Sequence, residues 1–367
     1  MKSANIQIFL VKNKKSRNFA GRMKTVHLTK DTRLTGDFGA TIGFFDGVHR
    51  GHQYVVKQLR EQATRRGLPS MVVTFDRHPR QVVQSDWQPL LLSTLEEKER
   101  LLAQTGIDML VVLSFDEQMA ALSAHDFMQQ VLKEQLGVSM LLTGYDNHFG
   151  HRQQGKAEGF DDYVAYGREV GIDVVCGFGL QLKDFGLQTT DFRLQTSDFR
   201  LQTIDDGCYV SSSLVRRLLG EGRVEEVALC LGRPYEISGI VAHGEQMGRQ
   251  IGFPTANISI DTHRMIPKRG VYAVRLAPSP SSLIPHPSSL TLYQGMTNIG
   301  MRPTFDGHKL TIETHIFDFH EDLYGRQLTI QFMARLRDEQ SFESAEALAL
   351  QMQHDEQQAR KILTPHP

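Results

Sequence analysis

The spacing of apolar residues changes after about residue 233, and this change constrains the fold more than any other feature of the chain. Before it, Phe38–Phe44, Met71–Phe75 and Met109–Leu113 read as strands, and Arg50–Arg66 has helical spacing. Strands that alternate with helices predict parallel βαβ units, so we expect an α/β domain with an open parallel sheet. Ligands of such sheets bind at the carboxyl ends of the strands.

Two serines are placed to begin helices in this part of the chain. Ser93 and Glu96 predict a capping box for a helix that ends at Ala103, and Ser123 can cap a helix that reaches Leu136. The remaining elements predicted here are strands at Met140–Thr143 and Asp173–Cys176 and a helix at Asp161–Val170.

After about residue 233 the chain becomes a series of short strands separated by Gly and Pro. The strand candidates are Tyr235–Val241, Val271–Leu276, Leu292–Thr297, Leu310–Phe317 and Leu328–Leu336. This pattern is typical of a small antiparallel β-barrel, and a last helix from about Glu343 to Ile362 would pack against it. We expect one domain over residues 24–222 and a second over 231–367, with 1–23 as a tail or a mis-assigned start.

Two repeated segments interrupt this plan. Residues 184–204 hold three seven-residue copies that begin D-F-G-L-Q-T-T, and residues 277–291 repeat P-S-S-L at Pro280 and Pro287. Three copies with one Phe and one Leu each fit a coiled coil poorly. We expect both inserts to be exposed loops without a catalytic role.

Composition narrows the function classes. Lys and Arg total 41 against 42 for Asp and Glu, so no excess positive charge exists for general nucleic-acid coating. Cys176, Cys208 and Cys230 are scattered and form no C-x-x-C pair, which predicts a reducing, cytoplasmic setting. No apolar run approaches the ~20 residues of a membrane span. We therefore expect small-molecule substrates and no nucleic-acid or membrane partner, and the oligomeric state cannot be read.

Residues 43–52 read G-F-F-D-G-V-H-R-G-H between a predicted strand and a predicted helix. Gly43, Gly47 and Gly51 allow tight turning and close approach of a ligand, and free N–H groups at a helix start favour an anion. His49 and His52 are three residues apart and face the same way on the first helical turn. Two imidazoles there can donate hydrogen bonds to phosphate oxygens. The alternative is a glycine-rich turn with two surface histidines.

Residues 248–257 read G-R-Q-I-G-F-P-T-A-N and form a second candidate site. Gly248 and Gly252 suit a loop beside phosphate, and Pro254 fixes the chain before Thr255 and Asn257. A hydroxyl and an amide carbonyl are hard oxygen ligands that suit Mg²⁺ shared with nucleotide phosphates. The alternative is that both side chains satisfy a turn.

The segment Leu310–Phe317 alternates in polarity. Glu313 shares one face of the predicted strand with Thr311, His315 and Phe317. A carboxylate fixed on a rigid strand can accept a proton from a substrate hydroxyl. The alternative is an exposed glutamate without a catalytic role.

Several ordered motifs together resemble the bifunctional riboflavin kinase/FAD synthetase family of bacteria. In the first part, the segments similar to the FAD synthetase signatures are G-F-F-D-G-V-H-R-G-H, F-D-R-H-P at Phe75–Pro79, G-Y-D-N-H-F-G at Gly144–Gly150 and S-S-S-L-V-R at Ser211–Arg216. In the second part, the segments similar to riboflavin kinase are L-G-R-P-Y at Leu231–Tyr235, G-R-Q-I-G-F-P-T-A-N, R-G-V-Y-A-V at Arg269–Val274, T-N-I-G-M-R-P-T at Thr297–Thr304, I-E-T-H at Ile312–His315 and D-L-Y-G at Asp322–Gly325.

The resemblance implies a Rossmann-like nucleotidyltransferase domain followed by a kinase barrel. The barrel would phosphorylate riboflavin to FMN with Mg·ATP, and the first domain would adenylylate FMN to FAD and release pyrophosphate. Implied catalytic residues are Glu313, His49 and His52. For adenylyl transfer, the implied ATP residues are Gly43, Phe45, Asp46, Gly51, Ser212, Ser213 and Arg216, and the flavin-side residues are His78, Pro79 and Asp146. For the kinase, the implied residues are Gly248, Arg249, Gly252 and Pro254 for ATP, Asn298 and Arg302 for flavin or phosphate, and Thr255 and Asn257 for the metal.

Three alternatives stay open at this point. The chain could be a riboflavin kinase with a degenerate first domain, although His49, Gly51 and His52 are all retained. It could be another adenylyl- or cytidylyltransferase, although the barrel argues against that. It could also be a flavin-binding module without turnover, which would need neither a base at Glu313 nor the metal ligands.

Overall fold

The computed structural model divides the chain into two compact units, Met1–Ser211 and Ser212–Pro367. The structure describes residues 18–19, 23–83, 88, 90–144, 149–150, 158–181, 209–242, 252–278, 292–304 and 307–364. The first repeated insert, 184–204, lies outside these residues, as does the second apart from Ala277 and Pro278. The sequence predicts the domain boundary between residues 222 and 231, after the helix that follows Ser211. In the structure this helix, Ser212–Glu221, is the first element of the second unit.

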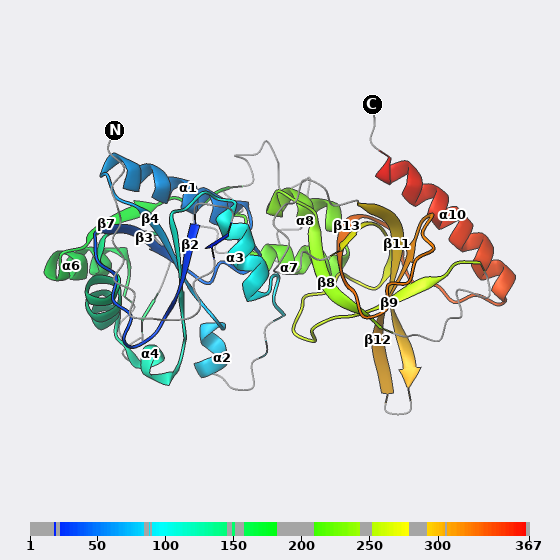
Figure 1. Ribbon diagram of the computed structural model, residues 1–367, viewed down its shortest axis with the longest axis horizontal. Coiled ribbons are helices and arrows are strands. Elements are labelled where there is room, and N and C mark those ends of the chain that lie inside the picture. The colour runs from blue at the N-terminus through cyan, green and yellow to red at the C-terminus, as the bar shows by residue number, and fades with distance from the viewer. Residues whose placement is uncertain are drawn as a thin grey trace, which may run out of the picture. The chain divides into compact units, whose positions relative to one another are not determined.

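The first unit is built on a seven-stranded sheet with the order β1-β2-β5-β4-β3-β6-β7. Its strands β2, β3, β4 and β7 are labelled in Figure 1. Its strands are β1 (Asn18–Phe19), β2 (Met23–Leu28), β3 (Phe38–Ile42), β4 (Ser70–Phe75), β5 (Met109–Leu113), β6 (Val138–Gly144) and β7 (Asp173–Gly177). All neighbours are parallel except β1 and β2. The predicted α/β architecture is therefore confirmed.

The order of the strands locates the ligand edge of this sheet. The chain runs from β3 through β4 to β5 in one direction and then returns to place β6 on the other side of β3. In open α/β sheets ligands bind outside the carboxyl ends of the strands at such a reversal. The segment that follows β3 begins at Gly43, so the histidine motif lies at this point.

Helices cover both faces of the sheet. They are η1 (Asp46–Val48), α1 (Arg50–Arg65), α2 (Pro79–Val83), α3 (Leu95–Ala103), α4 (Glu117–Ala121), α5 (Ala124–Asp126), η2 (Phe127–Gln135) and α6 (Phe160–Val170). Alternate residues of each strand enter opposite cores. One core joins Val72 and Leu110 to Leu59 of α1 and Leu102 of α3. The other joins Val73 and Val111 to side chains of η2.

The predicted capping box of α3 is wrong by one residue. Thr94 caps the helix by accepting from the Glu97 N–H at 3.2 Å, and the Glu97 carboxylate accepts from the Thr94 N–H at 2.9 Å. Ser93 does not serve as the cap because its hydroxyl accepts from the Gly47 N–H at 2.9 Å. The sequence pattern cannot show this competition, since the glycine lies 46 residues away.

Two further differences concern the first unit. Ser123 caps a helix as expected, but the segment toward Leu136 is a short α5 followed by the π-helical η2. The sequence pattern did not predict the strand β2, which contains the buried Met23. Residues Lys24 to Leu28 of this strand pair in parallel with β5.

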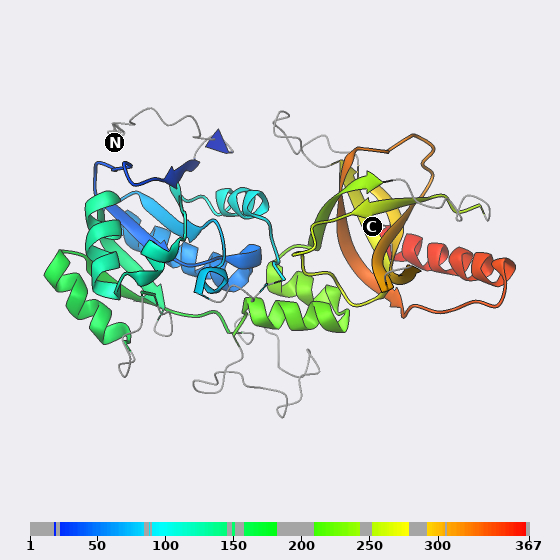
Figure 2. The same ribbon diagram turned by 90° about the horizontal axis from the view of Figure 1, so that it is seen from below.

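The second unit opens with α7 (Ser212–Glu221) and α8 (Val224–Leu231) and continues as a closed antiparallel barrel (Figure 2). Its strands are β8 (Tyr235–Ala242), β9 (Thr255–Ser259), β10 (Gly270–Pro278), β11 (Tyr293–Thr304), β12 (Gly307–Ile316) and β13 (Gln327–Arg337). They close in the order β10-β11-β12-β9-β8-β13. The predicted barrel is confirmed, and β9 is a strand that the sequence pattern did not reveal.

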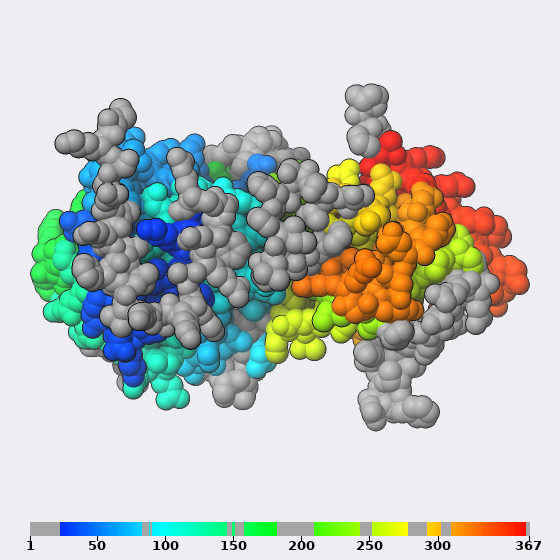
Figure 3. All heavy atoms as spheres, in the orientation of Figure 1, coloured from blue at the N-terminus to red at the C-terminus, as the bar shows by residue number. Residues whose placement is uncertain are grey.

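The last helix, α10 (Ala345–Leu363), packs on β10, β11 and β13, and its atoms, red in Figure 3, lie at the surface on one side of the unit. Ala359 and Leu363 are buried against barrel residues that include Phe317. Asp355 is only 2% exposed, and its carboxylate accepts hydrogen bonds from the Arg337 guanidinium at 2.8 and 2.9 Å. The helix is thereby fixed to the end of β13. None of the helices in the described residues combines the length and the apolar composition of a membrane span.

Candidate functional site

The chain turns sharply between β3 and α1 to present the two histidines. Phe45 adopts a left-handed conformation with φ of 52°, η1 follows, and His49 caps α1. The Nδ1 atom of His49 accepts from the His52 N–H at 3.3 Å. The two rings stack with centroids 3.6 Å apart and planes 19° apart. This stacking holds both imidazoles at the first turn of α1, on the side that the three-residue spacing predicts.

The structure indicates how each of the two histidine rings can donate a hydrogen bond. Because Nδ1 of His49 accepts a hydrogen bond, its ring proton is assigned to Nε2. Burial and the nearby charge of Lys98 lower the pKa of His52 to about 3. A neutral imidazole donates a hydrogen bond to a phosphate oxygen without adding a positive charge. The His52 ring therefore stays neutral over the whole physiological range of pH.

Asp46 fixes the segment in front of the histidines. It is 3% exposed, and its carboxylate accepts from the backbone N–H groups of Leu92 at 3.0 Å and Ser93 at 3.1 Å. The Ser93 hydroxyl also donates to it at 3.3 Å. These bonds tie η1 to the residues just before α3. In the structure, Asp46 therefore shapes the loop that carries the histidines.

Glycine is needed at the start of α1 because of a neighbouring carbonyl. A Cβ atom on Gly51 would lie 2.6 Å from the Val210 oxygen, which is too close for real contacts. Gly47 has a φ of 75°, a conformation that L residues rarely adopt. Gly43 directly follows β3, and a Cβ atom added to it would lie 3.1 Å from the Phe45 ring. The three glycines thus serve close packing in this loop.

The predicted flavin-side residues lie at the end of the neighbouring strand β4. Nδ1 of His78 accepts from the Arg80 N–H at 3.1 Å, and the His78 N–H donates to the Gln81 side chain at 3.0 Å. The His78 ring meets the Phe44 ring edge-on at 4.7 Å. Pro79 begins α2. Asp146 lies outside the described residues.

Lys98 is a buried charged residue in this region that the motifs do not identify. Its side chain comes from α3 and reaches Phe44 and the end of β4, where it donates three hydrogen bonds. Its position three and four residues before the buried Leu101 and Leu102 is the sequence signal that could have placed it on the core face of α3.

In the second unit, β9, β12 and β11 bring three predicted residues into one row. Glu313 lies directly opposite Asn257 on one side and opposite Asn298 on the other. Directly opposite residues share a face of the sheet, with Cβ atoms about 4.5–5.5 Å apart. Thr255 lies two residues from Asn257 and opposite His315, so it belongs to the same face. The row joins a carboxylate to two amides, and the Thr255 hydroxyl lies on the same face.

The start of β9 is anchored beside this row. Nδ1 of His315 lies 2.8 Å from the Pro254 oxygen, and the His315 ring meets the Phe253 ring at 5.2 Å. Gly252, with a φ of 86°, turns the chain into this segment. Gly248 and Arg249 lie outside the described residues, and only the backbone of Arg302 is described, opposite Lys309.

The predicted residues Ser212, Ser213 and Arg216 form the first turns of α7 and belong to the second unit. Ser212 and Arg216 are half-buried, and Ser213 is exposed. Within the described residues, no three His, Cys, Asp or Glu side chains gather into a metal site.

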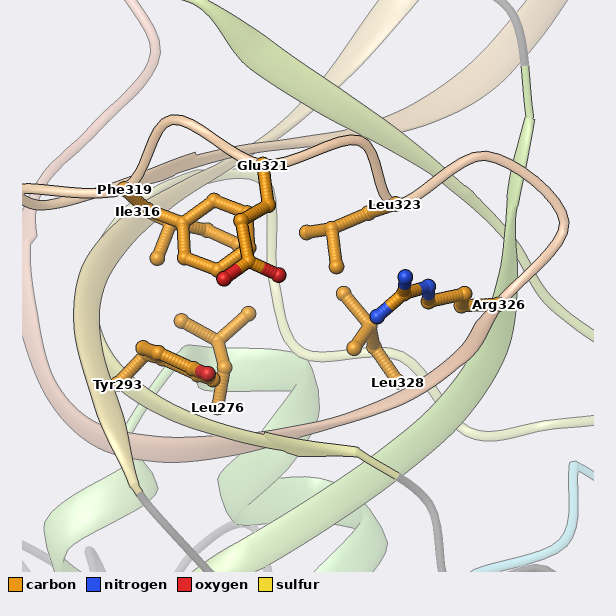
Figure 4. Close-up of a pocket in the computed structure, with 8 residues that line it drawn as sticks. All are labelled: Leu276, Tyr293, Ile316, Phe319, Glu321, Leu323, Arg326 and Leu328. Carbon is orange, nitrogen blue, oxygen red and sulfur yellow. The ribbon is translucent and has the colours of Figure 1, made fainter.

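A small cavity at one end of the barrel is separate from these residues (Figure 4). It measures about 50 Å³, and the side chains of Glu321 and Arg326 point toward it from the loop before β13. Ile316 lines it, and by strand alternation Ile316 and Glu313 lie on opposite faces of β12. The space is far below the roughly 300 Å³ of a ligand pocket, so it adds nothing to the site.

Comparisons with known proteins match both halves of the chain. A family model described as FAD synthetase matches residues 33–180, and one described as riboflavin kinase matches residues 231–363. A bifunctional riboflavin kinase/FMN adenylyltransferase of Escherichia coli K12 is 35% identical over 325 residues, which cover 88% of this chain and 91% of that protein. The protein of the same description from Listeria monocytogenes is 35% identical over 344 residues, covering 92% and 98%.

A third such protein, from Bacillus subtilis, is 33% identical over 345 residues, which cover 92% of this chain and 97% of the relative. Among solved structures, one described as a macrolide-efflux protein from Streptococcus pneumoniae superposes with a TM-score of 0.73 and 28% identity. The superposition covers 92% of this chain and 98% of that one, so the two share a fold over both units.

Proposed function

The chain belongs to the family of bifunctional riboflavin kinases/FMN adenylyltransferases, and we propose from this membership which of its residues perform the two reactions. The riboflavin kinase domain phosphorylates riboflavin to FMN with ATP. The FAD synthetase domain transfers the adenylyl group of a second ATP to FMN, which gives FAD and pyrophosphate.

Glu313 is the general base of the kinase reaction. The observation that carries this role is its place in the row between Asn257 and Asn298 on a rigid, closed barrel. Its carboxylate accepts the proton of the terminal ribityl hydroxyl of riboflavin as that oxygen attacks the γ-phosphorus of ATP. The new oxygen–phosphorus bond forms while the bond to ADP breaks. Such transfers depend mainly on positioning and charge neutralisation, so few catalytic groups suffice.

The residues beside Glu313 suit a magnesium ion. Thr255 and Asn257 offer a hydroxyl and an amide oxygen on one face of β9, and Mg²⁺ typically takes one or two protein oxygens together with substrate phosphates and water. When bound, the ion would neutralise charge on the phosphates of ATP. Gly248, Arg249, Gly252 and Pro254 are assigned to ATP, and Asn298 and Arg302 to flavin or phosphate.

The histidine motif holds the triphosphate for adenylyl transfer. A phosphate oxygen of FMN attacks the α-phosphorus of ATP, and the bond to pyrophosphate breaks. His49 and His52 donate hydrogen bonds to oxygens that gain charge as pyrophosphate leaves. Burial lowers the pKa of His52 to about 3, so its ring donates without adding a positive charge.

The other residues of this domain are assigned to substrate binding. Gly43, Phe45, Asp46 and Gly51 form the ATP loop, and Ser212, Ser213 and Arg216 supply further ATP contacts by family resemblance. His78, Pro79 and Asp146 are assigned to the flavin side. The three scattered cysteines, without a C-x-x-C pair, favour a reducing, cytoplasmic location, which we include in the proposal.

Asn257→Leu tests the metal assignment. The substitution keeps the volume of the side chain and removes its oxygen, so we expect FMN formation to need a higher Mg²⁺ concentration and to fall by at least about tenfold at low Mg²⁺. FAD formation from supplied FMN should not change. Ser259→Ala, at the exposed end of the same strand, is the control. An unchanged Mg²⁺ titration of FMN formation in Asn257→Leu would remove this residue from the metal site.

A further inference from the structure

Lys98 carries a buried ammonium group that links two loops of the first unit. The residue is 3% exposed. Its Nζ donates to the Phe44 oxygen at 3.1 Å, to the Thr74 hydroxyl at 3.2 Å and to the Phe75 oxygen at 3.0 Å. An ammonium group has three donors, so these neutral acceptors satisfy all of them. The same group lies 4.3 Å from the centre of the Phe44 ring.

A lysine in this place is costly for the fold. Burying an ammonium group removes its hydration, and an apolar side chain of similar length would avoid that loss. Burial lowers the pKa of Lys98 to about 8, against the opposing influence of Asp46 from η1, Glu99 from α3 and Asp76 from the loop after β4. His52 faces it from α1. Packing alone therefore does not explain a charged residue here.

The three acceptors lie where β3 and β4 end and the two loops proposed for adenylyl transfer begin. Phe44 follows β3 and continues into the segment that carries His49 and His52. Thr74 and Phe75 end β4, directly before the loop that carries His78. The Phe44 ring contacts both groups, since the ammonium lies 4.3 Å from its centre and the His78 ring meets it in a T-shaped arrangement at 4.7 Å. One charged group thus holds the ends of β3 and β4 in a fixed relation.

We propose that Lys98 is a positioning residue for adenylyl transfer, whose ammonium sets the spacing between the loop that binds ATP and the loop on the flavin side. The inference rests on the proposed function, since that function assigns the two loops to the two substrates. Lys98 is buried and acts through Phe44 and the strand ends, without touching a substrate.

Lys98→Met tests the inference in the full-length chain. We expect kcat/KM for FAD formation from FMN to fall about 10- to 100-fold, because small displacements of reacting groups have effects of this size. Riboflavin phosphorylation, measured in the same preparation, should stay unchanged and reports that the chain is folded. The matched control is Lys133→Met, which removes a lysine that donates to the Gly171 oxygen at 2.9 Å elsewhere in the same unit. It should leave both activities unchanged.

The pH profile of the unmodified chain gives a second readout that needs no variant. As pH rises through about 8, Lys98 loses its proton and the charge over Phe44, so FAD formation should fall relative to riboflavin phosphorylation. Stability should change in the opposite direction. Between about 8 and the ordinary value of 10.5, the unfolded chain holds a proton that the folded chain has released, so stability rises with pH. A merely structural lysine would not produce this divergence, and Lys98→Met should abolish it.

The outcomes separate the inference from the function beneath it. If Lys98→Met keeps full FAD formation while His52→Ala loses it, Lys98 is not a positioning residue and the proposed function stands. A wild-type profile without a relative fall near pH 8 also overturns the inference. If the unmodified chain makes no FAD from FMN, the proposed function of the first unit fails.

Discussion

Glu313→Gln should abolish FMN formation from riboflavin and leave FAD formation from supplied FMN at its original rate. Loss of a general base costs about 100- to 10,000-fold, and the amide cannot accept the ribityl proton. The substitution keeps the size and the polarity of the side chain. Its position between Asn257 and Asn298 should therefore be preserved. The two rates are measured by chromatography of flavin products from parallel incubations with riboflavin and with FMN.

Glu321→Gln is the matched control for this variant. Glu321 is an exposed carboxylate in the same unit, beside the small cavity of Figure 4 and outside the row of Glu313. It should keep both activities. If Glu313→Gln still phosphorylates riboflavin at the wild-type rate, the base has been assigned to the wrong residue.

Removing either histidine of the first unit should give the converse pattern. We expect His49→Ala and His52→Ala each to lower FAD formation about 100- to 1,000-fold, the usual loss for one hydrogen-bond donor to a developing charge. His49→Ala also removes the acceptor for the His52 N–H and the ring stacked on His52, so its effect should be at least as large. Riboflavin phosphorylation should persist in both variants.

The pH profile adds a check on the protonation state of this pair. Because the pKa of His52 is lowered to about 3, the ring stays neutral and FAD formation should show no step from His52 roughly between pH 5 and 7. The control for the two histidine variants is Lys57→Ala, an exposed change on the same helix, which should keep full FAD formation. Full FAD formation in His52→Ala would show that the imidazole does not support the leaving group.

The sequence predicted the elements whose pattern is strong and local. The central strands β4 and β5 are continuous apolar runs buried on both faces, and α1 places Val56, Leu59 and Ala63 at helical spacing, so their positions follow from pattern alone. The strand β9 did not, because T-A-N-I-S has one buried residue and is held by its pairing with β8 and β12. Long-range pairing of this kind leaves no periodic signal in five residues.

The candidate site shows the same division. Strand alternation puts Glu313 and His315 on one face, and the structure adds that Asn257 and Asn298 lie beside Glu313. The hydrogen bonds of Asp46 with residues 92–93 and those of Lys98 with Phe44 and β4 join segments 23 to 54 residues apart. Such contacts depend on the strand order, which no motif encodes. This is why the buried supports of the histidine loop emerge only from the fold.

The most direct test of the account is a product analysis of the unmodified full-length chain with ATP and Mg²⁺, supplied in one sample with riboflavin and in the other with FMN. Two working sites predict FAD in both samples, with FMN as an intermediate product in the first. FMN from riboflavin without any FAD in the FMN sample would mean a kinase whose first domain is inactive. Bound flavin without product in either sample would contradict the account and indicate a binding module.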